Sequence, residues 1–221
     1  MRDYGITREY ALCVLDSKPS AGRLKRTENA VCLVASAIME LQSSGAVGLD
    51  EKGKLTIVGE LPQDKYYLSG IYEDIELSRA KKPKNYVKDI ILSFSVKKRN
   101  QLIQAVVDSL LEEGALVEQT RDILIFEKRE LVPPESAVLP VIERIRAEFL
   151  ENGELDDDTT VLAILLQESG LLKKYFSPRE EDQLKSRVKE LRENSASPLV
   201  RGIISDIHAM VAAVAASSAA H

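Results

Sequence analysis

Apolar residues that recur three or four positions apart dominate this chain, and this spacing constrains its fold more than any other feature. Residues at that spacing line one face of an α-helix. The sets are Val31, Val34, Ile38 and Leu41; Leu68, Ile71 and Ile75; Leu102, Ile103, Val106, Val107, Leu110 and Leu111; Val138, Ile142, Ile145 and Phe149; and Leu184, Val188 and Leu191. The sequence therefore predicts a mainly α fold whose amphipathic helices share one core.

The predicted helix ends carry residue types that satisfy free backbone groups. Ser177, followed three residues later by Glu180, fits a capping box at the start of a helix. We expect the Asp158 carboxylate to cap the helix that follows it. Gly45 and Gly114 each come directly after a helix, where a left-handed residue ends it.

Sequence typical of β-hairpins follows both glycines. After Gly45, we expect Val47–Leu49 to pair with residues 55–58. The second half of the chain repeats this order of helix, glycine and hairpin around Gly114. The repeat has two interpretations, an internal duplication and a common way of ending a helix in a hairpin.

The second hairpin contains an unusual apolar run. Residues 116–118 are expected to return through residues 120–122 to the strand Ile123-Leu124-Ile125-Phe126. A hairpin with one solvated face should alternate apolar and polar residues, and these four do not alternate. We therefore expect this strand to be covered on both faces, by the core, by another subunit or by lipid.

Composition limits the class of protein. The chain has 221 residues, 44% of them hydrophobic, and no Gly/Ser-rich or Pro-rich linker divides it. One domain over residues 1–221 is expected. The net charge of −5 argues against a surface wholly committed to nucleic acid. No signal peptide or membrane-spanning run is found, so we expect a cytoplasmic protein, at most peripheral at a membrane surface.

The residue types that most active sites use are scarce. There are two histidines and two cysteines. Cys13 and Cys32 lie among apolar residues without a CxxC spacing, which indicates buried reduced thiols. His208 has no nucleophile or metal-ligand motif beside it. We therefore expect no enzyme activity, no cofactor and no metal site.

The last predicted helix covers residues 198–216 and is strongly apolar. It is too short to span a bilayer and carries Asp206 near its middle. We expect this helix to lie buried at the centre of the fold.

Basic residues cluster near several predicted helix ends. Each cluster is interpreted either as a solvated helix end or as a contact with an anionic membrane, where each charge contributes about 1 kcal/mol. The clusters are Arg23, Lys25 and Arg26; Lys81, Lys82 and Lys84; Lys97, Lys98 and Arg99; and Lys173 and Lys174.

The order and spacing of these segments resemble the Golgi phosphoprotein 3 family over nearly the whole chain. The segments that carry the resemblance are Tyr10-Ala11-Leu12-Cys13-Val14-Leu15-Asp16, Gly45-Ala46-Val47-Gly48-Leu49-Asp50, residues 106–116, Ile123-Leu124-Ile125-Phe126, residues 160–172 and Ala209-Met210-Val211-Ala212-Ala213-Val214. The resemblance implies a helical domain decorated with hairpins. It also implies a non-enzymatic adaptor, since eukaryotic members are peripheral Golgi proteins that recognise phosphatidylinositol 4-phosphate and the cytosolic tails of glycosyltransferases.

The chain departs from the family where those members bind the lipid headgroup. Their pocket uses a tryptophan and several basic residues, and this chain has no Trp. Pairing the helices back from the two glycines puts Val34, Asn100 and Ile103 at positions where family arginines are expected. The resemblance thus implies a headgroup pocket that is not retained. Lys97, Lys98 and Arg99 lie beside that region and are predicted to contact an anionic or phosphoinositide-type headgroup by proximity.

The second hairpin follows the family more closely. In the family the equivalent hairpin mediates self-association and meets the membrane. The resemblance implies that Ile123, Leu124, Ile125 and Phe126 mediate homo-oligomerisation or membrane docking here.

Two functions follow as hypotheses. The first is a non-enzymatic peripheral membrane-binding or adaptor protein with protein clients and no nucleic-acid partner. The alternative is a winged-helix-like nucleic-acid-binding protein that presents the helix at residues 96–113 to DNA. That helix carries Asp108, Glu112 and Glu113, whose negative charges would repel the phosphates of DNA. Only the basic residues of its first turn, Lys97, Lys98 and Arg99, favour the alternative.

Overall fold

A computed structural model describes residues 4–18, 20–92, 96–123, 126–151, 153–194 and 198–218. The predicted mainly α fold with hairpins after helices is confirmed. The helices are α1 (Ile6–Ser17), α2 (Thr27–Ser43), α3 (Ser69–Leu77), α4 (Pro83–Leu92), α5 (Lys97–Glu112), α6 (Glu135–Phe149), α7 (Asp157–Glu168), α8 (Leu172–Tyr175), α9 (Pro178–Asn194) and α10 (Pro198–Ser218), with the short 3-10 helices η1 (Ala21–Arg23) and η2 (Gln63–Leu68). The strands β1 (Val47–Leu49), β2 (Leu55–Ile57), β3 (Val117–Ile123) and β4 (Phe126–Val132) form two antiparallel hairpins.

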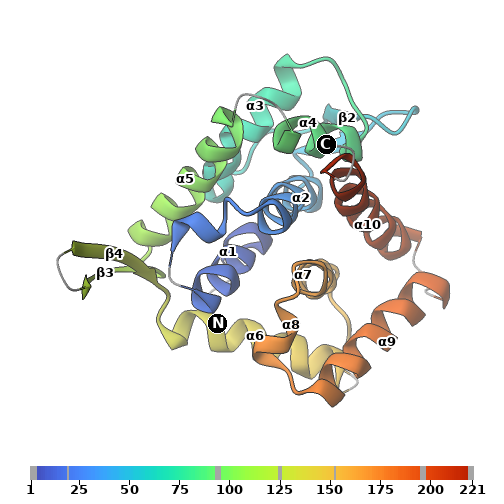
Figure 1. Ribbon diagram of the computed structural model, residues 1–221. Helices are drawn as coiled ribbons and strands as arrows, with labels where there is room; N and C mark the ends of the chain where they lie inside the picture. Colours follow the sequence, from blue (N-terminus) through green and yellow to red (C-terminus); the bar gives the residue numbers. More distant parts are fainter. Residues whose placement is uncertain are drawn as a thin grey trace.

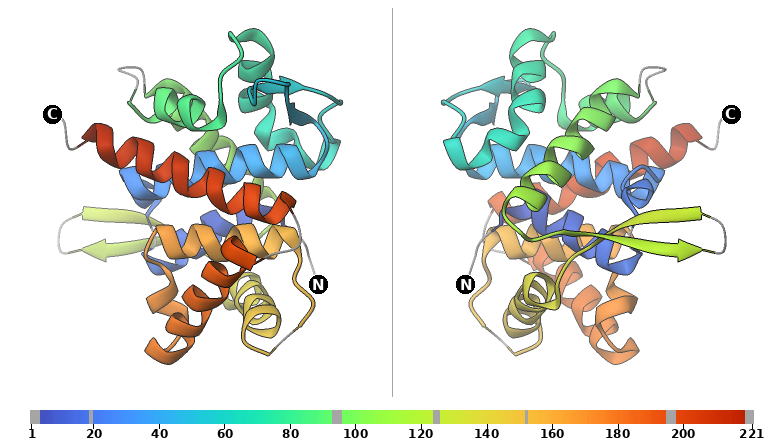
Figure 2. Two further views of the ribbon diagram at one scale, coloured as in Figure 1. Left: turned by 90° about the vertical axis from the view of Figure 1, so that its right-hand side faces the viewer. Right: turned by 90° about the vertical axis from the view of Figure 1, so that its left-hand side faces the viewer.

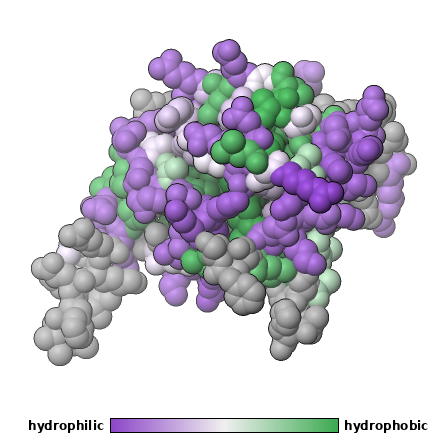
Figure 3. Space-filling model, turned by 90° about the horizontal axis from the view of Figure 1, so that it is seen from above, coloured by the Kyte–Doolittle hydropathy of each residue, from purple (hydrophilic) through white to green (hydrophobic). Residues whose placement is uncertain are grey.

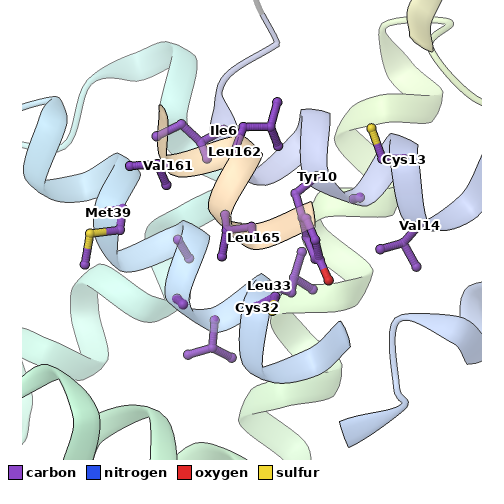
Figure 4. Packing of buried hydrophobic residues seen from close by; sticks show 14 of the residues in the cluster. Ile6, Tyr10, Cys13, Val14, Cys32, Leu33, Met39, Val161, Leu162 and Leu165 are labelled. Carbon is purple, nitrogen blue, oxygen red and sulfur yellow. The ribbon is translucent and has the colours of Figure 1, made fainter. Parts of the chain in front are cut away.

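Helices α1, α2 and α7 form the centre of the core. Every residue of α1 from Ile6 to Leu15 is buried, as are residues 29–41 of α2 and residues 159–166 of α7. The other long helices surround this centre (Figure 1). Figure 4 shows side chains from all three central helices that meet there, among them Tyr10, Leu33 and Leu165. Each of these helices has an apolar run, at residues 10–15, 30–35 and 161–166, that covers its whole circumference, so other helices must enclose it.

A buried polar network holds the N-terminus of α1. The Glu40 carboxylate of α2 accepts a hydrogen bond from the Thr7 backbone N–H (2.8 Å) and another from the Tyr67 hydroxyl. Lys65 lies 3.2 Å from the same carboxylate and balances its charge. Gly5 adopts a φ of 80°, and a Cβ there would collide with Glu40. The network satisfies a backbone donor at a helix start that water cannot reach.

The predicted helix caps are confirmed in one case and wrong in the other. The Ser177 backbone N–H donates to Glu180 (2.8 Å) and the Glu180 N–H to the Ser177 hydroxyl (3.4 Å), a capping box. At α7 the cap is Asp156, which accepts from the backbone N–H groups of Asp158 and Thr159 (3.0 and 3.1 Å). Asp158 cannot cap this helix, because a cap precedes the first helical residue and α7 begins at Asp157.

The C-terminal helix lies at one side of the fold, so the expectation that it is central is wrong. Ile207, Met210 and Val214 of α10 are buried, whereas Ala212 and Ala215 are exposed. The helix packs against α4, α2, α7 and α9 with one face only (Figure 2). Many of its apolar residues are alanines, and a side chain with so little apolar area gains little free energy from burial. No helix within the described residues is long and apolar enough to cross a membrane.

The two hairpins agree with the sequence to different degrees. The predicted pairing of Val47–Leu49 with the strand that begins at Leu55 is confirmed, with Val47 opposite Ile57, although the strand ends at Ile57 and not at residue 58. In the second hairpin the predicted turn at residues 120–122 is wrong, because these residues continue β3 and pair with residues 127–129. Each added pair satisfies more backbone groups, and Ile123 opposite Phe126 leaves only a two-residue connection.

Candidate functional site

Two predicted basic clusters, far apart in the sequence, meet at one edge of the fold. Lys81 and Lys82 lead into α4, and Lys97, Lys98 and Arg99 form the first turn of α5. A surface cavity of about 420 Å³ between α3, α4 and α5 is lined by Lys81, Lys88 and Lys98. We call this edge, residues 77–92 and 96–99, the basic edge. The basic edge includes α4 and lies in the upper part of Figure 1.

The basic edge concentrates positive charge that the whole chain does not have. Residues 78–99 contain eight Lys or Arg and one Asp, a net charge of +7. The whole chain carries −5, so the rest of it carries −12. Such segregation creates a local positive potential on a protein that is acidic overall.

Some lysines of the basic edge are balanced and others are not. Lys81 pairs with Asp89 (2.6 Å), and Lys98 pairs with Asp74 of α3. Within the described part of the chain, four exposed lysines of this edge make no ion pair. They are Lys82, Lys84, Lys88 and Lys97.

Asp74 of α3 lines the cavity of the basic edge beside Lys98. Its carboxylate accepts from Lys98, from the Tyr86 hydroxyl (2.9 Å) and from the Ser78 hydroxyl (3.1 Å). Burial alone would raise the pKa of Asp74, but these hydrogen bonds outweigh it and lower the pKa. Burial and the neighbouring Asp74 charge raise the pKa of Tyr86, so Tyr86 stays a neutral donor.

A second cavity, of about 390 Å³, lies between α3 and α5 and shares Asp74 and Lys98 with the first. Its apolar lining includes Ile71, Leu77 and Leu102. The two cavities are therefore neighbours, and Lys98 stands between them.

Apolar side chains are exposed on the same edge. The exposed fraction is 84% for Leu77, 37% for Leu92 and 44% for Val96. Figure 3 looks down on this side of the molecule and shows apolar side chains set among hydrophilic ones. The edge thus combines cationic and apolar groups.

The residues proposed for headgroup contact have different surroundings. Lys97 and Lys98 are exposed, whereas Arg99 is half-buried and its Nε has no hydrogen-bond partner among the described residues. Val34 and Ile103 are buried in the core. Buried aliphatic side chains at these two positions cannot contact a ligand at the surface.

The second hairpin lies away from the basic edge. Ile123 ends β3 and Phe126 begins β4, while Leu124 and Ile125 lie outside the described residues. The lysines begin α5, and the hairpin follows its other end, roughly 24 Å along a helix of 16 residues. Figure 2 shows β3 and β4 projecting sideways from the body of the molecule.

Sequence patterns predict only part of the basic edge. They identify the clusters of adjacent lysines, but they do not identify Arg79, Lys88 or the exposed Leu77, Leu92 and Val96 as parts of the same surface. A charge count over a window of about 20 residues would have shown the excess. The exposed apolar residues gave no signal, because helical spacing assigns them to a core.

Cys13, Cys32 and His208 lie apart from the basic edge, each in its own surroundings. Cys13 and Cys32 are buried and free, as predicted, and burial raises the pKa of each thiol to about 12. His208 Nδ1 lies 3.0 Å from Glu168 Oε1 and joins α10 to α7. In the described ranges, no three His, Cys, Asp or Glu side chains gather as metal ligands. The arrangement of the basic edge instead suits the binding of anions.

Comparison with known proteins identifies a family. The family model described as Golgi phosphoprotein 3 (GPP34) matches residues 8–207, which run from α1 into α10. No curated protein matches the chain significantly.

Proposed function

Because the chain belongs to the Golgi phosphoprotein 3 family, we propose that it is a non-enzymatic adaptor that binds peripherally to anionic membrane surfaces. The observation that carries this proposal is the net charge of +7 on residues 78–99 of an otherwise acidic chain. The basic edge would face the membrane, and the acidic remainder would be repelled from it. Charge segregation of this kind orients a protein at a charged surface.

The four unpaired lysines set the scale of the attraction. Each Lys or Arg near an anionic leaflet contributes about 1 kcal/mol. Lys82, Lys84, Lys88 and Lys97 together would contribute about 4 kcal/mol, roughly a thousandfold in binding. The attraction should weaken with salt, because exposed charges are screened beyond about 10 Å at 0.1 M ionic strength.

The proposed lipid specificity is broad. Lys97, Lys98 and Arg99 would contact headgroups as part of the basic edge and not as a closed pocket. Burial of Val34 and Ile103 supports this, because the positions expected for family arginines then offer no cation at the surface. We expect anionic lipids in general to support binding, with little preference for a phosphoinositide.

The nucleic-acid alternative is less well supported. Helix α5 buries its apolar face, including Ile103 and Val106, and its exposed positions further along include Asp108 and Glu112. Only its first turn is basic. The exposed Leu77 and Leu92 would have no partner on a phosphate backbone, whereas lipid offers one.

Binding to vesicles tests the proposal. The protein is sedimented with phosphatidylcholine vesicles that either contain or lack anionic phosphatidylserine, at several salt concentrations. We expect binding only with the anionic lipid. The variant Lys84→Glu/Lys88→Glu should lose most of it, while the control Lys173→Glu/Lys189→Glu, with the same net charge, should retain it.

Two results would overturn the proposal. One is an equal loss of binding in both charge-reversal variants, which would show that only net charge matters. The other is salt-sensitive binding to duplex DNA without vesicle binding, which would favour the nucleic-acid alternative.

We further propose that the second hairpin mediates self-association. Its projection from the body and the apolar run Ile123-Leu124-Ile125-Phe126 at its end support this role. Replacing residues 120–129 by Asn-Gly keeps Gln119 opposite Glu130 and removes the run. Light scattering should show an oligomer for the full chain and a monomer for the variant, and an unchanged mass would exclude the hairpin.

A further inference from the structure

We infer that Leu77, Leu92 and Val96 insert into the lipid interface as apolar anchors, so that the basic edge is the contact plane of the protein. This inference rests on the proposed function and deepens it, because it assigns the residues that enter the membrane. It also assigns the second hairpin a place outside that plane.

Two of the three side chains line cavities together with the same lysine. Leu77 and Lys98 line the cavity between α3 and α5, and Leu92 and Lys98 line the cavity beside α4. Val96 is the residue before α5 and lies two positions from Lys98. Leu77, Leu92 and the cation therefore belong to one patch of surface, and Val96 is exposed at the same end of α5.

Packing within the fold does not account for these apolar residues. Helix α4 buries Tyr86, Val87, Ile90 and Ile91, and its last residue, Leu92, is left exposed. Leu77 is likewise the last residue of α3, and Val96 precedes α5. All three stand where helices end at the surface, so they can enter lipid without any change in the helices.

Charge complementarity identifies the occupant of this patch. A protein partner with a dry apolar interface would leave Lys82, Lys84, Lys88 and Lys97 without counter-charges unless it were acidic at each of them. An anionic bilayer supplies negative charge over the whole plane and an apolar layer just beneath it. Interleaved lysine and aliphatic side chains match that layering.

The same geometry places the second hairpin outside the contact plane. It leaves the far end of α5 and extends sideways, whereas α3 and α4 stand at the upper side of both views in Figure 2. With the basic edge on the membrane, β3 and β4 would run beside the bilayer. The hairpin is then available to a second copy and is not needed as an anchor.

Single tryptophans test the insertion, because the chain contains none and gives no background. We would compare Leu77→Trp and Leu92→Trp with Leu139→Trp, an exposed apolar position on α6, and with Phe126→Trp on the hairpin. On phosphatidylserine-containing vesicles, the emission of the first two should shift to the blue and be quenched by brominated lipid. The other two should show neither change.

A loss-of-anchor variant supplies a second measurement. Leu77→Asn/Leu92→Asn should weaken vesicle binding at least tenfold (about 1.4 kcal/mol), with helical circular dichroism unchanged. Leu139→Asn should leave binding unchanged. The shortened hairpin should bind vesicles as well as the full chain does.

The outcomes separate this inference from the proposed function. Vesicle binding with water-exposed tryptophans at positions 77 and 92 would overturn the anchors and leave the proposed function standing. Quenching only at position 126 would assign insertion to the hairpin instead. An absence of binding to anionic vesicles would overturn the proposed function and this inference with it.

Discussion

The hairpins β1–β2 and β3–β4 both follow a helix that ends at a glycine, and the local chemistry of the two helix ends is the same. Gly45 and Gly114 have φ values of 75° and 70°. The N–H of the next residue donates five positions back, from Ala46 to Leu41 (3.1 Å) and from Ala115 to Leu110 (2.8 Å). This is a helix end closed by a left-handed residue.

A third helix ends in the same way without a hairpin. Gly170 has a φ of 68°, and the Leu171 N–H donates to Leu166 (2.8 Å). The chain then continues into α8 and not into a strand. The recurrence therefore favours a common helix ending over an internal duplication.

The two hairpins differ in what they contact. In β1–β2, Val47 is 2% exposed, and the Leu55 N–H donates to the carbonyl of Lys81 (2.9 Å), so this hairpin is part of the body. In β3–β4, the first residue of the strand, Val117, is 46% exposed, and the strands have seven residues each. The same helix ending thus precedes a hairpin that belongs to the core and one that leaves it.

The largest expected effect concerns the two helices before the hairpins, because both hold the N-terminus of α1. Glu40 of α2 is buried and accepts from Thr7 and Tyr67, while the exposed Glu113 after α5 pairs with Arg8. Glu40→Ala should lower the free energy of unfolding by about 4 kcal/mol, since it leaves the buried Thr7 N–H and Tyr67 hydroxyl without their acceptor and removes the charge that Lys65 faces in the interior. Glu113→Ala should cost less, about 2 kcal/mol, because Glu113 is exposed although its partner Arg8 is buried. Equal losses in urea unfolding would refute the distinction.

The next effect tests the difference in packing directly. Val47→Ala removes two buried methyl groups and should cost about 2 kcal/mol. Val117→Ala makes the same change at an exposed position and should cost less than about 0.5 kcal/mol. Chemical denaturation of both variants measures the contrast. Similar costs would mean that β3 is covered in solution, which an oligomer would explain.

A smaller effect tests whether the helix endings are equivalent. At Gly45, Gly114 and Gly170, a Cβ would meet nothing within 4 Å, so backbone strain alone opposes alanine. Each Gly→Ala variant should therefore lose a similar 1 to 2 kcal/mol, about the cost of a left-handed alanine. Thermal unfolding would show the similarity. A much larger loss at one glycine would show that its hairpin contributes to the helix ending.

The smallest effect is a pH dependence in the turn of the first hairpin. The Asp50 carboxylate accepts from the backbone N–H groups of Lys54 and Lys52 (2.8 Å each), and these bonds lower its pKa. The carboxylate stabilises the turn at pH values above its ordinary pKa, and this stabilisation is lost as the pH falls through the lowered one. The difference in melting temperature between the wild type and Asp50→Ala should therefore vanish in acid. A difference that persists there would assign the effect to the side chain's packing.

The candidate site was only partly predictable from the sequence. The clusters around Lys81 and Lys97 were visible as separate runs, and the absence of Trp pointed to a lost pocket. That the two clusters form one edge depends on α4 and α5 lying side by side around Lys98. No short-range pattern reports which helix ends will be neighbours.

The sequence by itself determined the helices, their glycine endings, the capping box at Ser177 and the existence of both hairpins. These features depend on groups a few residues apart, whose contacts are the same in any fold. Only the tertiary structure decided that α10 lies at one side, that β3–β4 leaves the core, and that Leu77 and Leu92 face solvent beside the lysines. Those outcomes depend on which surfaces, distant in the sequence, pack against each other. Apolar spacing indicates that one face of a helix is apolar, but it does not indicate which element covers that face.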